Sequence, residues 1–195
     1  MIRIIIVGTA ALLPLLQGTS VDAQERWGIE LRGSGGISTQ DTDREAYETG
    51  FGLEGTVQYR FLSSVAAYGG YHYTQFNAME SIAGPDMHLE NTGYVAGLRF
   101  ERPLREGSAT SGWVRTGLTY DNLEIEDPAG EIVNESGHGL GWEFGAGLVA
   151  PIIAGWSATP GVRYRSTSRD FGIGDAAVPV ELQHVAFEMG ITRRF

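Results

Sequence analysis

The last twelve residues of the chain alternate in polarity and end on an aromatic residue. One set of alternate positions is apolar except for its arginine: Val185, Phe187, Met189, Ile191, Arg193 and Phe195. The intervening set is small, polar or charged: His184, Ala186, Glu188, Gly190, Thr192 and Arg194. Successive side chains of a β-strand point to opposite faces, so this segment predicts a strand with two unlike faces. Such a strand is typical of a sheet with lipid on one side and a polar interior on the other.

Seven further segments alternate in the same way, so the eight predicted strands are residues 27–32, 51–61, 65–74, 93–101, 113–121, 140–149, 156–165 and 184–195. On a helix, charged residues such as Glu54 and Arg60 would be scattered around the axis, whereas on a strand they share one side. The predicted connections are residues 38–49, 62–64, 77–91, 102–111, 122–138, 151–155 and 167–180. Apart from the fourth, which is longer than expected, they alternate between long and short, as in bacterial outer-membrane barrels. We therefore predict an all-β fold, an eight-stranded antiparallel up-and-down transmembrane β-barrel with both ends in the periplasm.

The first 23 residues have the pattern of a cleaved signal peptide. Arg3 supplies the positive charge, residues 4–16 are an apolar stretch, and Val21 and Ala23 are small residues at the positions that a signal peptidase reads. A stretch of thirteen residues rising 1.5 Å each is too short to cross about 30 Å of hydrocarbon. We predict a signal peptide over residues 1–23, an exported barrel domain over residues 24–195, and no membrane helix.

The aromatic residues indicate which face of the predicted barrel meets lipid. The chain has 4 Trp, 8 Tyr and 8 Phe, and by the alternation fifteen of these lie on the apolar face. Two lie on the polar face, Tyr68 and Trp113, and three lie in predicted loops, Tyr47, Phe76 and Phe171. A soluble barrel of the lipocalin type would have the opposite arrangement, with its aromatic residues inside. The aromatic face is therefore predicted to be the outer, lipid-facing one.

The polar face carries a nearly balanced set of charges, and every basic residue of the chain is arginine. The acids are Glu30, Glu54, Glu101, Asp121, Glu143 and Glu188. The bases are Arg32, Arg60, Arg99, Arg115, Arg163, Arg165 and Arg194. Side chains fill the interior of an eight-stranded barrel, and buried charges there need partners. We predict an interior Arg–carboxylate network that plugs the barrel; the alternative is a gated or narrow pore.

The predicted external loops hold the excess negative charge, since the chain has a net charge of −10. The alternatives for these acidic loops are divalent-cation binding near lipopolysaccharide phosphates, docking of a basic partner, or a solvated rim without a ligand. No basic stripe is present, so we predict no nucleic-acid partner.

Residues for catalysis or metal binding are few. The chain has no Cys and four His, of which His72 and His184 fall on the inward face, and His88 and His138 in predicted loops. Ser136 lies near Glu135 and His138, but closeness in sequence is not the geometry of a catalytic triad. We predict no catalytic residue, no cofactor and no metal site.

Three internal segments and the terminal Phe195 resemble the OmpA/OmpX-like superfamily of small outer-membrane β-barrels, the porin-like outer membrane protein β-barrel domain group. These segments are VAAYGGYHYTQF (65–76), TGYVAGLRF (92–100) and GVRY (161–164). The resemblance implies that the barrel-assembly machinery recognises the C-terminal strand and Phe195. It also implies roles in envelope integrity, adhesion or stress resistance, without a shared catalytic residue. We expect no C-terminal peptidoglycan-binding domain. The His-x-Ser-Asn signature of the lipid A deacylases, which are also eight-stranded barrels, is not present in the chain.

We therefore expect a monomeric protein of a Gram-negative outer membrane with a structural or surface-interaction role. Its expected partners are outer-membrane lipid, lipopolysaccharide and the assembly machinery. The alternatives are a lipid A-modifying enzyme of the deacylase kind and a small pore for ions or solutes.

Overall fold

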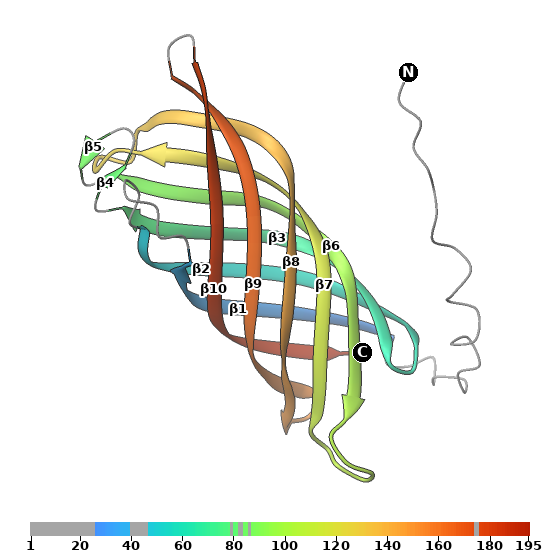
Figure 1. The fold of residues 1–195 in the computed structure, drawn as a ribbon. Coiled ribbons are helices and arrows are strands. Elements are labelled where there is room, and N and C mark those ends of the chain that lie inside the picture. Colours follow the sequence, from blue (N-terminus) through green and yellow to red (C-terminus); the bar gives the residue numbers. More distant parts are fainter. Residues whose placement is uncertain (1–25, 40–46, 79, 82–83, 86, 174–175) are drawn as a thin grey trace, which may run out of the picture.

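Eight long antiparallel strands close into a barrel in the computed structural model (Figure 1). The structure describes residues 26–39, 47–78, 80–81, 84–85, 87–173 and 176–195. The barrel strands are β1 (Trp27–Ser38), β2 (Tyr47–Leu62), β3 (Val65–Ala78), β6 (His88–Pro103), β7 (Ser111–Glu126), β8 (Ile132–Ile153), β9 (Trp156–Ile173) and β10 (Ala176–Arg194). The short strands β4 (Glu80–Ser81) and β5 (Gly84–Pro85) form a separate pair. The predicted eight-stranded up-and-down barrel is confirmed, whereas the predicted signal peptide lies outside the described residues.

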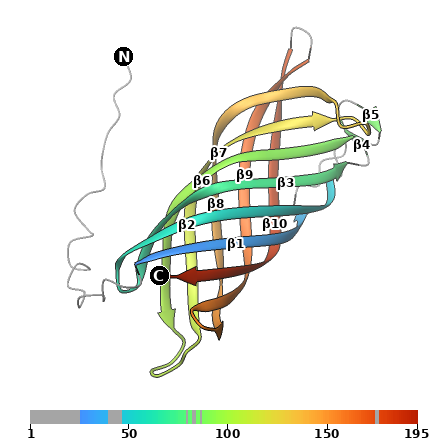
Figure 2. The same ribbon diagram turned by 180° about the vertical axis from the view of Figure 1, so that it is seen from behind.

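The ring closes where the first strand meets the last. Each strand pairs with its neighbour in the order β1-β10-β9-β8-β7-β6-β3-β2, and β1 pairs antiparallel with β10. The Phe195 amide donates a hydrogen bond of 2.9 Å to the Trp27 carbonyl, and the Trp27 amide returns one of 3.1 Å. Figure 2 shows β1 lying between β2 and the end of β10. The strands are strongly tilted, so those on one side of the barrel cross those on the other (Figures 1 and 2).

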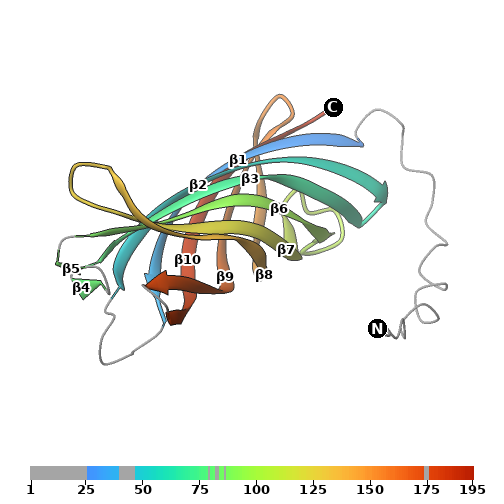
Figure 3. The same cartoon turned by 90° about the horizontal axis from the view of Figure 1, so that it is seen from above.

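The two ends of the barrel differ. We call the end that holds Trp27 and Phe195 the turn end; there, residues 63–64, 104–110 and 154–155 join the strands. The two-residue turn between β8 and β9 consists of Ala154, with a φ of 39°, and Gly155, with a φ of 80°. The opposite end, which we call the loop end, carries β4, β5 and the projecting β7–β8 hairpin (Figure 3).

The strands extend further toward the loop end than the sequence predicted. Much of the predicted loops 77–91, 122–138 and 167–180 is strand, so Tyr47, Phe76 and Phe171 lie in β2, β3 and β9 instead of loops. His88 begins β6 and His138 lies within β8, which also corrects their assignment to loops. The reason is physical: a strand that has left the lipid zone has water on its outer face, so the alternation used to find it fades. About 9–11 residues suffice to cross hydrocarbon, whereas β8 has 22.

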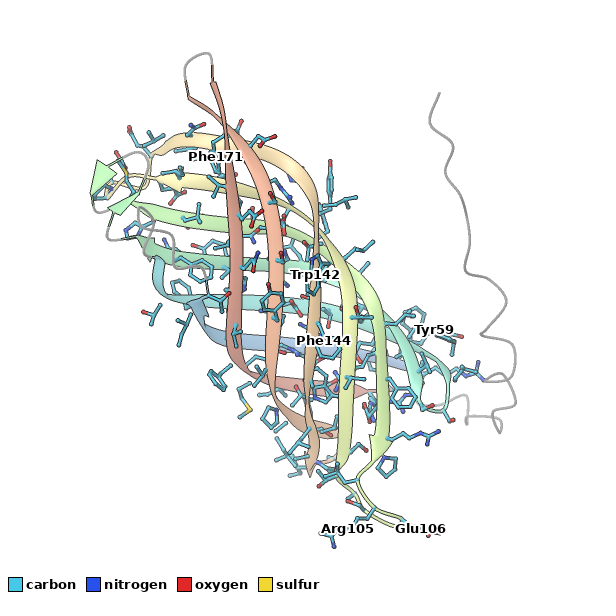
Figure 4. All side chains as sticks on the ribbon, viewed as in Figure 1. Tyr59, Arg105, Glu106, Trp142, Phe144 and Phe171 are labelled. Carbon is cyan, nitrogen blue, oxygen red and sulfur yellow. The ribbon has the colours of Figure 1, made fainter. Side chains whose placement is uncertain are left out.

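The outer wall is apolar and the inner wall is largely polar. Leu31, Tyr94 and Phe187 are each more than 60% exposed on the outside. Outward aromatic rings pack across neighbouring strands, such as Trp27 with Tyr59 at 4.9 Å. In Figure 4, Trp142 and Phe144 lie on β8, while Arg105 and Glu106 lie at the tip of the β6–β7 turn.

Candidate functional site: the barrel interior

Inward side chains form successive layers along the barrel axis. We call the first the ionic layer; it consists of Glu30, Arg32, Glu54, Arg99, Arg115, Glu143, Arg163, Arg165 and Glu188. Nearer the turn end lies a second group, the turn-end cluster of Arg60, Glu101 and Arg194. The structure thus places all thirteen charged residues of the predicted polar face inside the barrel, twelve of them in these two groups and Asp121 nearer the loop end. The alternation puts them on one side because each has the inward parity of its strand.

The ionic layer spans the lumen, because many of its pairs join strands that are not neighbours. Glu54 on β2 accepts hydrogen bonds from Arg115 on β7 at 2.8 Å and from Arg165 on β9 at 3.0 Å. Arg165 also donates to Glu143 on β8 at 2.6 Å. Arg163 donates a further short bond to Glu54. These five side chains are buried, so the charges neutralise one another away from water.

Glu30 links the remaining members of the layer. Its carboxylate accepts bonds from Arg99 at 2.9 Å, from Gln58 at 2.6 Å and from Thr159 at 2.5 Å. Arg32 lies 2.7 Å from Glu30 and also donates to Glu188. In the turn-end cluster, Glu101 accepts from Arg194 at 2.6 Å. Arg60 lies 3.5 Å from the same carboxylate.

Two inward aromatic side chains cross the lumen within this layer. The Trp113 ring faces the guanidinium groups of Arg99 at 4.7 Å and Arg32 at 4.9 Å, an arrangement that stabilises desolvated cations. The Tyr68 hydroxyl donates to Glu143 at 2.8 Å. The sequence placed both rings on the polar face but indicated no role for them.

Inward glycines make room for the two rings. A Cβ at Gly161 would lie 2.6 Å from the Trp113 ring, and a Cβ at Gly117 would overlap the Tyr68 hydroxyl. The chain therefore lines its lumen with glycine where a large side chain crosses it.

A polar layer lies between the ionic layer and the loop end. We define it as His72, Thr74, Asn91, Asp121, Arg169 and His184. Asp121 accepts from Thr167 at 2.9 Å and from Arg169, and lies 3.8 Å from His72 Nε2. The sequence placed Arg169 in an external loop, but it is buried and points inward. The signal that could have found it is parity, since Arg163, Arg165 and Arg169 occupy alternate positions of one strand.

An apolar layer lies at the loop end of the lumen. It consists of Phe76, Leu89, Leu123, Ile125, Phe171, Val180 and Leu182. The Phe76 ring packs against the His184 ring at 5.1 Å, which joins this layer to the polar one. The sequence did not predict it, because six of these seven residues, all but Leu182, fall in predicted loops and the lumen was expected to be polar.

The outer wall at the loop end carries an acidic triad, Glu90, Glu124 and Glu126. Their carboxylates lie within 4.8 Å of one another, and Tyr73 donates a short hydrogen bond to Glu90. Burial raises the pKa of Glu126 above its ordinary value of 4.5, and the charges of Glu90 and Glu124 raise this pKa further. These glutamates lie at strand ends instead of in the loops to which the sequence assigned them.

Ser136 and His138 do not share a hydrogen bond. The Ser136 hydroxyl accepts from the Leu123 amide at 3.0 Å and donates to the Gly137 carbonyl at 2.9 Å. The His138 ring instead stacks on Tyr120 at 5.3 Å.

Comparison with known proteins agrees with this architecture. A family model described as outer membrane protein beta-barrel domain matches residues 8–195, whereas curated protein sequences give no match. Among solved structures, Neisserial surface protein A is 12% identical with a TM-score of 0.65, covering 87% of this chain and 97% of that chain. OprG of Pseudomonas aeruginosa is 11% identical with a TM-score of 0.57, covering 88% and 97%. Ail, the attachment invasion locus protein of Yersinia pestis, is 16% identical with a TM-score of 0.50, covering 88% and 99%.

At these identities the structural likeness shows the fold alone, and the family match gives the membership. No helix among the described residues is both long and apolar enough to cross a membrane. The apolar outer wall and the closed ring of strands fit the family match, which covers nearly the whole chain. The chain therefore belongs to the outer membrane protein β-barrel domain family and is a protein of the Gram-negative outer membrane.

Proposed function

We propose that this protein is a non-conducting outer-membrane barrel with a structural and surface-interaction role. The observation that carries the proposal is the filling of the lumen by three successive layers, ionic, polar and apolar. An ion entering from the loop end would first meet Phe76, Leu89 and Phe171, each at most 1% exposed. It would then meet paired charges, and separating a buried Arg–carboxylate pair is costly.

The contacts across the lumen support a plug in preference to a pore. Glu54 on β2 and Arg165 on β9 are three strands apart in the ring of eight, yet their side chains meet. Tyr68 on β3 and Glu143 on β8 meet in the same way. Arginine suits such contacts because its planar group can bond two carboxylates at once. The network joins opposite walls, and its role is to stiffen the barrel.

Planar-bilayer recording tests the closed state. The wild-type protein is expected to give no conductance above leak. The double variant Glu54→Ala plus Arg115→Ala, which removes a buried pair at the centre of the ionic layer, is the matched test of whether that layer blocks the lumen. Frequent, well-resolved openings of the wild-type protein would contradict the plug and favour the small pore.

The surface role rests on the charge of the loop end. Glu131, Glu135 and Asp170 are exposed there, and the acidic triad lies on the adjoining outer wall. A surface of one sign attracts partners of the opposite sign. The ligand class that it favours is a cationic surface or peptide.

Cells that display the protein test the surface role. We expect them to retain a fluorescent polylysine peptide better than cells that display the variant Glu131→Gln, Glu135→Gln and Asp170→Asn. The matched control variant is Glu106→Gln, which changes an exposed acid at the turn end. Equal retention by all three strains would contradict the surface role.

We also propose that the chain has no catalytic role. The support is that Ser136 and His138 make different contacts. The Ser136 hydroxyl bonds to the backbone, whereas the His138 ring stacks on Tyr120. The mass of lipid A is expected to stay unchanged when the protein is overexpressed. A deacylated product that disappears in a Ser136→Ala variant would establish the enzyme instead.

A further inference from the structure

A groove of about 590 Å³ lies on the apolar outer wall. Its floor is Gly55 on β2 and Gly69 on β3, and its walls include Ile29, Leu31, Val57 and Ile191. The register places Val57 beside Gly69 and Leu31 beside Gly55, so the two glycines lie in adjacent rows of the sheet. The groove is therefore a recess in the lipid-facing surface, created where outward side chains are absent.

Packing does not require these two glycines. A Cβ at Gly55 would meet no atom within 4 Å, and a Cβ at Gly69 would meet only the Val95 carbonyl oxygen at 3.7 Å. The inward Gly70 is different, because a Cβ there would overlap the Gly55 carbonyl oxygen. The small size of Gly55 and Gly69 thus shapes the outer surface, whereas that of Gly70 serves the packing of the sheet.

A cation lies at the edge of the groove nearest the turn end. Arg193 is exposed on the outer face of β10, where the register sets it between Ile29 on β1 and Trp156 on β9. Ile29 and Trp156 both line the groove. The Arg193 guanidinium lies 5.5 Å from the Trp156 ring, and within the described part of the chain it makes no ion pair with a carboxylate. Arg193 therefore offers its charge to the surroundings of the barrel.

The position of Arg193 indicates which leaflet of the membrane surrounds it. The end of a barrel with short turns faces the periplasm, and Trp with Arg at that level marks the interface of the inner leaflet. An apolar recess that begins beside an interfacial cation matches one acyl chain attached to an anionic headgroup.

We propose that this groove binds one anionic phospholipid of the periplasmic leaflet. Its phosphate pairs with Arg193 beside Trp156, and one acyl chain lies over Gly55 and Gly69 between the apolar walls. Lipopolysaccharide belongs to the other leaflet and so is not the occupant. This proposal does not depend on the surface role proposed above.

Native mass spectrometry of the refolded protein in detergent tests the site, with phosphatidylglycerol and phosphatidylcholine of identical acyl chains as probes. The wild-type protein is expected to bind one phosphatidylglycerol about fivefold more tightly than phosphatidylcholine, the factor for one cation facing an anionic headgroup. Arg193→Gln should abolish this preference, and Arg193→Lys should keep it. Gly55→Leu plus Gly69→Leu should weaken binding of both lipids at least fivefold by filling the groove.

Gly35→Leu is the matched control for the groove variant. Gly35 also faces outward, a Cβ there meets no atom within 4 Å, and it does not line the groove. Heat-modifiable migration establishes that each variant is folded. Should the double leucine variant fail to fold, Gly55→Leu alone asks the same question.

Three outcomes overturn the proposal. Wild-type-like binding by both Arg193→Gln and the groove variant excludes the site. Loss of the headgroup preference in Arg193→Gln, with unchanged binding in the groove variant, excludes the acyl-chain part. A groove variant that alters only the monomer–dimer distribution identifies the groove as a contact between two copies of the chain.

Discussion

Arg165 on β9 donates a hydrogen bond of 3.0 Å to Glu54 on β2, three strands away around the ring. The same guanidinium bonds Glu143 at 2.6 Å, so a single arginine connects three strands through the lumen. Such contacts make the interior part of the framework of the barrel, because removing one partner leaves a buried charge uncompensated.

Arg99→Ala is expected to lower the free energy of unfolding by about 3–5 kcal/mol, the range for breaking a buried ion pair. The Arg99 side chain is 3% exposed and pairs with Glu30 at 2.9 Å. The measurement is the urea-unfolding midpoint in detergent micelles. Arg102→Ala, an exposed arginine on the same strand, is the control and should have little effect. Equal midpoints for the two variants would mean that the Arg99–Glu30 pair does not stabilise the barrel.

Gly161→Ala is expected to destabilise the protein by about 1–3 kcal/mol, the usual cost of overpacking. The added methyl group would lie 2.6 Å from the Trp113 ring, which is held in place by a 3.0 Å hydrogen bond to the Leu148 carbonyl. Gly35→Ala should be nearly neutral, since its methyl group meets open space. The measurement is a comparison of the unfolding curves of the two variants and the wild-type protein. An unchanged stability of Gly161→Ala would show that the Trp113 ring can move aside.

Lowering the pH is expected to stabilise the loop end of β7. The pKa of Glu126 is raised above 4.5 by burial and by its acidic neighbours. Because this pKa is higher in the folded than in the unfolded chain, the associated stabilisation is present at acidic pH. It is lost as the pH rises through the folded-state pKa. Hydrogen exchange of the last β7 amides, followed across this titration, should show slower opening at low pH.

Glu126→Gln supplies the control for this pH dependence. The variant removes the titrating carboxyl group and part of the repulsion from Glu90 and Glu124. Its exchange rates, corrected for the intrinsic effect of pH, should vary less than those of the wild-type protein. A wild-type-like pH profile in the variant would assign the dependence to another group.

Deleting Phe195 is expected to slow assembly into the outer membrane while leaving export intact. The deletion removes both hydrogen bonds between Phe195 and Trp27 at the junction where the ring closes. It also removes the terminal residue that is predicted to be recognised by the assembly machinery. Pulse-chase labelling with heat-modifiable migration as the readout measures assembly, and Ile152→Ala, at the exposed turn-end tip of β8, is the control. Assembly at the wild-type rate would contradict a role for the terminal residue.

The sequence by itself determined the two faces of every barrel strand. Period-two alternation placed Phe187 outside and Glu188 inside without knowledge of any contact, because parity along a strand is a local property. It also led to the closed barrel, since eight two-faced strands with an apolar outer side leave no other way to satisfy every backbone group in lipid.

Where the strands end, and which inward side chains contact one another, was decided only by the tertiary structure. Phe76, Phe171 and Arg169 were assigned to loops because the outer face of a strand above the lipid zone no longer has to be apolar. That Arg165 meets Glu54, or that Trp113 lies beside Arg99, depends on barrel closure and strand tilt, which bring together residues far apart in sequence. The groove over Gly55 and Gly69 could not be predicted from the sequence either. Two small residues on different strands form a recess only when the register sets them in adjacent rows.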